Sequence, residues 1–497
     1  MPTSLSELAA SLDELVPEVL RRTGTPGLSV AAAHGDALLS RAYGWHDVAA
    51  GRAMAPESIF PVGSMSKLYT AIAVLQLIED GLVGLHDPVD AHLDGVRCAN
   101  PLGARRVTVY DLLTFRSGLA VDTPASSLEP PPPLRDHLAR AYAGARGREY
   151  AGAAPRWSSR VGERYHYSNL GIATLGLLVE QRNARRLSLS EYLRRRLFEP
   201  LGMTATWLSD WRYAEPDPAR TCGYACYGGL AIPSPEIRSA DFPADGVHTT
   251  PREHLRLLRA LMACGALDGE RILRPESVRL MLTPQVSMEG SDGVWPSEGW
   301  QTGLVAILTD LGRHHRRFGH PGAHPWGWWG SAWAYPRLDC AVVVCANGWD
   351  MLGWHNPANR DATAVVADAV AAFFGREHGA PARDPRRSWA WKRAFVAGAL
   401  LAERTGGTLG VTAPLSHEPP PDAAVHGAGW DADGFRAGLL AGGEPPIDPS
   451  RAAQLLRSAP DAPPPEQLEA LLADLGMAYG CPLPLWMWPE GEQPALL

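Results

Sequence analysis

The sequence predicts a fold of the α+β class, in which an antiparallel sheet is flanked by helices and accompanied by an all-helical subdomain. Strand patterns lie near both ends of the first 375 residues, at residues 27–44 and 299–347, and helical patterns dominate between them. Strands from the two ends can pair in one sheet that the helices cover. A functional site is then expected between the sheet and the helical part.

Length and charge set the first limits on organisation and function. The chain has 497 residues, which exceeds one typical domain. Its composition, 45% hydrophobic and 20% charged, is that of an ordinary globular protein. The net charge of −8 argues against nucleic acid as the main partner. We expect a first domain over residues 1–380 and a mostly helical C-terminal extension over residues 381–497.

The chain shows no sign of export or of a membrane segment. Its first residues lack the basic and apolar regions of a secretory signal, and no apolar run is long enough to cross a bilayer. Seven cysteines, an odd number and widely spread, fit a reducing compartment. Cys222 and Cys226 have no second pair at zinc spacing, so we expect neither a metal nor another cofactor. These features favour a cytoplasmic protein that does not bind membranes.

The first elements follow from their periodicity. Residues 5–22 place leucines and valines on one side of a helix, and Thr25-Pro-Gly ends it. Residues 27–33 and 37–44 are predicted to be two strands joined by a tight turn at His34-Gly-Asp.

The stretch at residues 61–79 organises the first domain. Apolar residues cover most of the surface of a helix that runs to Glu79, which is typical of a helix buried in a large domain. Gly63 before it and Gly81 after it are suited to its ends. Ser64 and Lys67 are three residues apart and lie on one face of its first turn. A hydroxyl and an amine thus meet where the helix dipole favours a developing anion.

Lysine is rare in this chain, which gives Lys67 more weight than its spacing alone. Only two lysines occur, Lys67 and Lys392, against 44 arginines. Arginine does not give up its proton, whereas a buried lysine can become neutral and act as a base. The lysine at position 67 therefore suggests chemistry that arginine cannot perform. The alternative is a solvated lysine at the end of a helix.

The same periodicities predict the remaining elements. Residues 107–119 contain the boundary between a strand, a turn and a helix. We expect helices at residues 134–140, 172–180, 190–203, 251–261 and 362–374. We expect strands at residues 301–308, 316–323, 330–336 and 339–347.

Three motifs follow one another in a recognisable order: Ser64-x-x-Lys67, Tyr167-Ser-Asn169, and His320-Pro-Gly322 on a predicted strand. In this order they resemble the serine β-lactamase and penicillin-binding-protein superfamily, and especially class C β-lactamases, family VIII esterases and D-aminopeptidase relatives. The framework segments VTVYDLLTFRSGL, YHYSNLGIATLGLLVE, LFEPLGMTATWL and GVHTTPREHLRLL support the resemblance, which covers residues 5–375. It implies a β-lactamase/transpeptidase-like fold.

The resemblance also implies roles for individual residues. Ser64 is the nucleophile that takes the acyl group, and Lys67 helps to deprotonate it. Tyr167 is the partner base that later gives a proton to the leaving group. Asn169 holds the lysine and orients the substrate. The backbone N–H groups of Ser64 and Ala323 form the oxyanion hole, in which each donor is commonly worth about 3 kcal/mol.

His320 and Pro321 depart from the pattern of the β-lactamases. That pattern has S-D-N and K-T-G motifs, whereas this chain has Tyr-Ser-Asn and His-Pro-Gly. His320, which the resemblance makes part of the catalytic set, stands where the lactamases carry lysine; the histidine is familiar among the esterases. Without the lysine the site has a weaker anchor for a substrate carboxylate, which argues against true β-lactamase activity. Pro321 removes one strand N–H, although not the one assigned to the oxyanion hole.

Tryptophans gather near the third motif. Eight of the chain's 17 lie between Trp295 and Trp354. Packing in the core is the default explanation. Their number beside an expected cleft also suggests an aromatic wall for a bulky acyl group or acceptor. On this hypothesis the substrate-binding residues are Gly322, Trp326, Trp328 and Trp329.

The resemblance stops near residue 380. A linker is expected at residues 383–387, and short helical patterns follow it. We expect a small helical appendage that caps the cleft, binds a partner or makes a dimer contact, and the sequence does not choose among these.

These observations predict an esterase-like serine hydrolase or acyltransferase that acts on a small ester or amide through acyl-Ser64. One alternative is a transacylase of specialised metabolism, which passes the acyl group to an amine. A D-aminopeptidase or weak β-lactamase is a second. A non-catalytic binding protein on the same fold is a third, and the intact motif residues argue against it.

Overall fold

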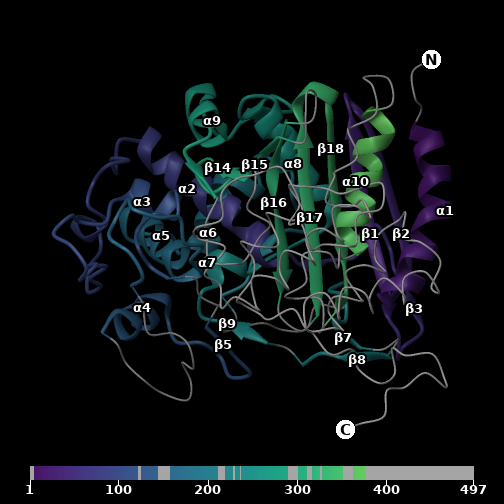
Figure 1. Cartoon of the computed structure of the whole chain (residues 1–497), viewed down its shortest axis with the longest axis horizontal. Helices are drawn as coiled ribbons and strands as arrows, with labels where there is room; N and C mark the ends of the chain where they lie inside the picture. Colours follow the sequence, from purple (N-terminus) through teal and green to yellow (C-terminus); the bar gives the residue numbers. More distant parts are fainter. Residues whose placement is uncertain are drawn as a thin grey trace, which may run out of the picture. The chain divides into compact units, whose positions relative to one another are not determined.

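The computed structural model is centred on a nine-stranded antiparallel sheet (Figure 1). It describes residues 5–120, 125–143, 157–210, 219–227, 230–235, 237–288, 300–310, 316–324, 327–350 and 362–375. The strand order is β13-β14-β15-β16-β17-β18-β1-β2-β3. The sheet strands are β1 (Gly27–His34), β2 (Ala37–Asp47), β3 (Arg52–Ala53), β13 (Val286–Ser287), β14 (Trp300–Thr302), β15 (Ile307–Asp310), β16 (Arg316–His324), β17 (Trp328–Tyr335) and β18 (Cys340–Ala346).

Helices cover this sheet and form most of the residues between its two halves. They are α1 (Leu5–Thr23), α2 (Ser66–Glu79), α3 (Val109–Leu113), α4 (Leu134–Tyr142), α5 (Asn169–Arg182), α6 (Leu189–Leu193), α7 (Phe242–Asp245), α8 (Pro251–Met262), α9 (Pro275–Leu282) and α10 (Ala362–Gly375). A short 3-10 turn, η1 (Gly63–Met65), leads into α2. Figure 1 shows α3, α4 and α5 gathered away from the sheet, which corresponds to the predicted helical subdomain.

Strands from both ends of the first domain meet in the middle of the sheet. β1 pairs with β2 along the hairpin and with β18, so that Leu28 lies opposite both Tyr43 and Ala346. Helices α8 and α10 both pack against β17, β18 and β1. Because all seven residues of β18 are buried, the two helices cover opposite faces. The predicted α+β class and its antiparallel sheet are therefore confirmed.

Short strands also occur within the helical part. They pair as β4 (Phe60–Pro61), β10 (Val247–Thr249) and β6 (Trp207–Leu208); β19 (Gly348–Asp350), β7 (Tyr224–Tyr227) and β8 (Leu230–Pro233); β5 (Ser126–Ser127) and β9 (Arg238–Ser239); and β11 (Ala266–Leu267) and β12 (Glu270–Arg271). Most have only two residues, so their pairing leaves little periodicity in the sequence.

Most predicted elements occur at their predicted places, with two errors among the strands. The strand predicted at the start of residues 107–119 is wrong, because Thr108 forms only an isolated bridge and caps α3, which begins at Val109. The helix at residues 5–22, the hairpin at 27–44 and the closing helix at 362–374 agree with the structure within a few residues. The single strand predicted at residues 301–308 is wrong. It is a hairpin of β14 and β15, because Val305 has a φ of +67° and reverses the chain.

Helix α2 is buried along nearly its whole length, as its sequence predicted. Every residue from Ser66 to Leu77 is buried. At the other end Gly81 adopts a φ of +70°, its N–H donates to the Ile78 carbonyl, and the Leu82 N–H donates to the Leu77 carbonyl. This pair of bonds is the Schellman ending that the glycine predicted.

The predicted C-terminal extension, residues 381–497, lies outside the described residues. Of the helices that the structure describes, none combines the length and the apolar character needed to span a bilayer.

Gly81→Ala should lower the free energy of unfolding by about 1 kcal/mol, because an alanine at positive φ carries that strain. No atom lies within 4 Å of the added Cβ, so the cost comes from the backbone alone. Urea unfolding of both proteins measures it. Gly103→Ala is the control, because Gly103 lacks a positive φ and its added Cβ meets Arg160 only at ordinary contact distance. Equal losses in the two variants would contradict the explanation.

Candidate active site

Ser64 and Lys67 form the centre of the site. Ser64 belongs to η1, Lys67 lies in the first turn of α2, and the Lys67 Nζ lies 2.8 Å from the Ser64 Oγ. The lysine side chain is fully buried, with 0% of its surface exposed, whereas Ser64 is partly exposed. A reagent can therefore reach the hydroxyl while the amine is shielded from water. This is the geometry of a nucleophile beside its base.

Backbone atoms of residues 243–247, which we name the 243–247 segment, hold the other side of Lys67. The amine donates to the Ala244 carbonyl at 3.1 Å, and the Thr70 hydroxyl donates to the Pro243 carbonyl at 2.6 Å. The Val247 N–H donates to the Ser66 hydroxyl at 2.9 Å. Ser66 thus helps to fix this segment. A carbonyl can only accept, so one N–H of Lys67 is committed to Ala244 and the lone pair of the neutral amine can face Ser64.

Strand β16 passes directly beside η1. β15 pairs with β16 only as far as Gly319, so the end of β16 that starts at His320 has β17 on one side and η1 on the other. Two glycines permit this approach. A Cβ on Gly322 would lie 2.0 Å from the Val62 carbonyl oxygen.

A Cβ on Gly63, whose φ is +51°, would lie 2.2 Å from the Ala323 carbonyl oxygen and 2.9 Å from its nitrogen. The backbones of Ser64 and Ala323, the two predicted oxyanion donors, therefore belong to segments in direct contact. The missing side chain of Gly322 admits the Val62 carbonyl, and its predicted contact with a substrate stays a prediction.

Tyr167 and His320 complete the cluster. The Lys67 Nζ lies 4.8 Å from the centroid of the Tyr167 ring. The Tyr167 hydroxyl lies 3.5 Å from the His320 Nε2, and both side chains are buried. Ser64, Lys67, Tyr167 and His320 are thus brought together from three separate parts of the chain.

The hydrogen bonds of His320 define its tautomer. Its Nδ1 is bonded to the Pro321 carbonyl, which can only accept, so Nδ1 carries the proton. Burial, reinforced by the nearby Lys67, lowers the pKa of His320 to about 3. At neutral pH the imidazole is therefore uncharged, and its Nε2 lone pair faces the Tyr167 hydroxyl as an acceptor.

Phe115 supports Tyr167 from the side of α3. The two rings stack with centroids 4.9 Å apart and planes inclined by 23°. The His166 N–H donates to the Phe115 carbonyl at 2.8 Å, which joins the two segments next to the tyrosine. Phe115 has a φ of +57°, a strained value for a non-glycine residue, so the surrounding segment must hold it in place.

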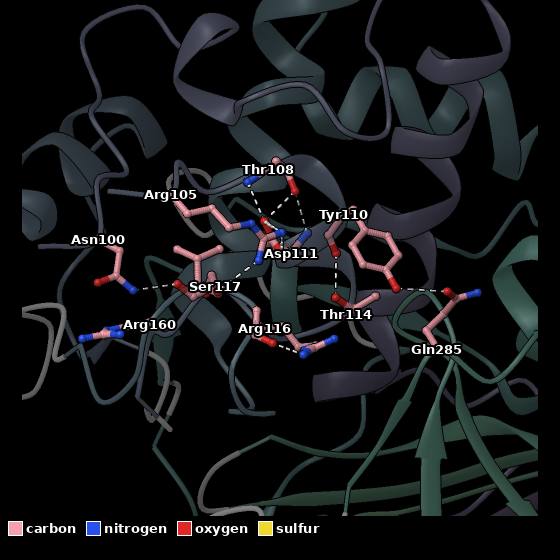
Figure 2. Close-up of polar contacts among 12 residues, drawn as sticks. Asn100, Arg105, Thr108, Tyr110, Asp111, Thr114, Arg116, Ser117, Arg160 and Gln285 are labelled. Atoms are coloured by element: carbon pink, nitrogen blue, oxygen red, sulfur yellow. Dashed lines mark hydrogen bonds and ion pairs between the residues drawn. The ribbon is translucent and has the colours of Figure 1, made fainter. Parts of the chain in front are cut away.

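Figure 2 shows the polar contacts that hold the Phe115 segment. Thr108 and Asp111 form a capping box at the start of α3, and Arg105 donates to the same carboxylate at 2.8 Å. The Tyr110 hydroxyl donates to Gln285 at 3.1 Å and so joins this segment to the residues before β13. These bonds fix the backbone from which Phe115 supports the tyrosine.

A model of the family described as Beta-lactamase matches residues 12–367. The chain belongs to the beta-lactamase family. The predicted superfamily is thereby confirmed, and family membership supports an enzyme of the serine hydrolase type.

Known proteins resemble this member of the beta-lactamase family over most of its first domain. Protein Rv1367c of Mycobacterium tuberculosis (strain ATCC 25618 / H37Rv) is 28% identical over 345 residues, 60% of this chain and 80% of that protein. A D-amino acid amidase from Ochrobactrum anthropi SV3, solved in complex with L-phenylalanine amide, has a TM-score of 0.59 at 21% identity, covering 75% of this chain and all of that one. A class C beta-lactamase has a TM-score of 0.57 at 17% identity, covering 74% and 96%. Likeness at these identities shows the shared fold.

In this beta-lactamase-family site, Asn169 and two of the described tryptophans, Trp328 and Trp329, belong to different elements. Asn169 is the buried first residue of α5, a helix that packs against α2 and α7. Trp328 is buried and donates to the Thr221 hydroxyl at 2.9 Å, which favours the packing explanation for it. Trp329 is partly exposed, pairs with Ala323 across the strands and stacks on Trp349 at 4.8 Å.

Trp329 therefore stays a candidate for substrate contact. Trp326 lies outside the described residues, so its part in the predicted aromatic wall stays a prediction.

Sequence reasoning missed three parts of the site. Ala244 acts through its carbonyl, and a backbone acceptor leaves no signal in the residue type. Asp245 is buried beside Lys67, yet in the sequence it is only one acid before the Thr250 helix cap. Phe115 was part of a framework segment without a role of its own. Within the described ranges, no three His, Cys, Asp or Glu side chains gather as metal ligands would.

Gly322→Ala should lower the reactivity of Ser64 about 100-fold, because moving η1 away from β16 by an ångström misplaces the nucleophile. The rate at which a fluorophosphonate labels Ser64 measures the effect. Gly171→Ala is the buried control, because its added Cβ would meet Leu112 and Ser168 at ordinary distances of 3.5 and 3.6 Å. Wild-type labelling by a folded Gly322→Ala protein would refute the argument for close approach.

Proposed function

We propose that this chain is a serine hydrolase that cleaves small esters or amides through an acyl-Ser64 intermediate. The observation that carries the proposal is the fully buried Lys67 amine, 2.8 Å from the partly exposed Ser64 hydroxyl. In the first step the Ser64 oxygen bonds to the acyl carbon while its proton passes to the Lys67 Nζ. The amine can take that proton because its contact with Ala244 uses an N–H and leaves the lone pair available.

Tyr167 is suited to the next proton transfer. When the tetrahedral intermediate collapses, the bond from the acyl carbon to the leaving group breaks and the departing oxygen or nitrogen needs a proton. The Tyr167 hydroxyl lies close to the cluster and can give it one, then recover a proton from Lys67. Water attacks the acyl-enzyme by the same route in reverse and releases the acid. The N–H groups of Ser64 and Ala323 are our proposed donors to the oxyanion in both steps.

The neutral His320 indicates the kind of substrate. A buried imidazole with a pKa of about 3 carries no charge with which to bind a carboxylate. We therefore infer an acyl donor without a carboxylate near its scissile bond, such as a simple ester or an amino-acid amide. The structural neighbour solved with L-phenylalanine amide is consistent with the amide.

Transfer of the acyl group to an amine is the alternative that uses the same intermediate. Product analysis with an ester and an added amine distinguishes the two: an amide product would support a transacylase, and carboxylic acid alone supports hydrolysis. A binding protein without catalysis would form neither.

A fluorophosphonate should label the wild-type protein at one serine, and Ser64→Ala should abolish that labelling. Lys67→Arg should slow it by about 100-fold or more, because arginine keeps the positive charge but cannot accept the proton. Intact-protein mass spectrometry measures both, with thermal melting to establish that the variants fold. An unlabelled wild-type protein, or equal labelling of Ser64→Ala, would contradict the assignment.

His320→Lys should shift the substrate preference toward anionic acyl donors. A cation at this position attracts a carboxylate, so kcat/KM for a carboxylate-bearing ester should rise relative to that for its neutral analogue, by about tenfold for 1.4 kcal/mol of attraction. The ratio of the two rates within each protein cancels any change in the amount of folded enzyme. His254→Asn is the control, since this second buried histidine bonds to Tyr69. An unchanged ratio in His320→Lys would count against the role given to the neutral histidine.

A further inference from the structure

Asp245 lies in the middle of the 243–247 segment, directly after the residue whose carbonyl binds Lys67. The Thr70 hydroxyl donates to the Pro243 carbonyl and the Val247 N–H donates to the Ser66 hydroxyl, and these bonds fix the segment on either side of Asp245. The carboxyl is 1% exposed, and neither of its oxygens has a hydrogen-bond partner among the described residues. The Ser239 hydroxyl lies near enough to influence the carboxyl but does not meet the geometry of a hydrogen bond. A buried carboxyl without a hydrogen-bond partner lowers the free energy of unfolding.

Asp241, another buried acid nearby, has hydrogen-bond partners for both of its carboxylate oxygens. Asp241 receives the Ala125 N–H at 2.8 Å on one oxygen and meets His137 at 2.9 Å on the other. Its charge is therefore compensated locally. The charge of Asp245 acts instead on Lys67, without a hydrogen bond between the two groups.

Helices α2 and α5 and the turn η1 pack on α7, and the groups around the Lys67–Asp245 pair come from these elements and from their neighbours. Helix α2 contributes Lys67, η1 contributes Ser64, and the turn before α5 contributes Tyr167. Strand β16 contributes His320, α4 contributes His137, and the residue before α7 is Asp241. His320 is neutral, and Asp241 is paired. Asp245 is thus the uncompensated acid facing the catalytic amine among the described residues.

We propose that Asp245 is a positioning residue that acts through Lys67: its buried negative charge stabilises the ammonium that forms when the amine takes the proton of Ser64. This inference rests on the proposed function. The charge has two consequences of opposite sign. It raises the proton affinity of Lys67, so the neutral amine takes the Ser64 proton more readily. The same effect lowers the fraction of Lys67 that is neutral at low pH.

The titration of Asp245 supports this assignment. Burial raises the pKa of the carboxyl to about 7, although Lys67 opposes the rise. A carboxyl whose pKa is higher in the folded than in the unfolded chain binds its proton more tightly when folded. It therefore contributes stability at low pH and loses it as the pH rises from about 4 to about 7. At neutral pH the chain thus keeps an acid that reduces its stability, which is expected of a functional group.

Asp245→Asn tests the proposal through the pH dependence of Ser64 labelling by a fluorophosphonate. Removing the negative charge should move the acidic limb of the rate profile to lower pH by about one unit. The limb belongs to the coupled groups together, so its shift is the measured quantity. Asp245→Ser is a second variant that also removes the charge. An acidic limb that stays in place in both variants would overturn the proposal.

Thermal melting provides a second readout that a merely structural aspartate would not give. Asp245→Asn should melt at a higher temperature than wild type at pH 8, and the difference should vanish toward pH 4, where the wild-type carboxyl is neutral. Asp111→Asn is the control, because Asp111 is equally buried but bonded to Arg105 and Thr108. It should melt at a lower temperature than wild type at pH 8, because its loss removes these bonds. A lower melting temperature of Asp245→Asn at pH 8 would contradict the proposal.

The labelling experiment separates this inference from the function on which it rests. If wild-type Ser64 is not labelled at any pH, the proposed function fails. If it is labelled with the same pH profile in wild type and in both Asp245 variants, the function stands and the role of Asp245 fails.

Discussion

The burial of one amine is the constraint on which the rest of this structure depends. Lys67 has no exposed surface, and a charged ammonium without partners in such a place would cost several kcal/mol. Its oxygen partners include Ser64 from the preceding turn and Ala244, which lies 177 residues later in the chain. The amine can be buried only if the 243–247 segment is held against α2. The bonds from Thr70 and Ser66 do this, and they use side chains from the same helical turn.

The second constraint is the close contact of η1 with β16. Among the described residues, no strand pairs with residues 320–324 on the side of η1. An ordinary side chain at Gly63 or Gly322 would collide with the opposite backbone. The sheet and the helical part therefore meet with their backbones in direct contact at these two glycines. Two backbones in contact keep their N–H groups fixed relative to the nucleophile, which is the condition for preorganised stabilisation of an oxyanion.

Local patterns in the sequence were sufficient to predict the long elements and the motif residues. Helix α2 has an apolar run and a terminal glycine, and the Ser64 and Lys67 spacing follows from one helical turn. Contacts between distant segments could not be predicted in this way. The bond from Lys67 to Ala244 involves a carbonyl that every residue type has, and the reversal at Val305 requires a φ that valine rarely adopts. Neither leaves a trace in residue type or in periodicity.

His320 and Asp245 influence the same proton in the same direction. A lysine in place of His320 would set a second cation beside Lys67 and oppose the formation of an ammonium there, whereas the neutral imidazole does not. Asp245, when ionised, stabilises that ammonium. The two residues together make Lys67 a stronger base than a site with two lysines would have. The same arrangement disfavours a substrate carboxylate, because its charge would add to that of Asp245 with no second cation to offset it. On the proposed function, the electrostatics that strengthen the base therefore also favour neutral acyl donors.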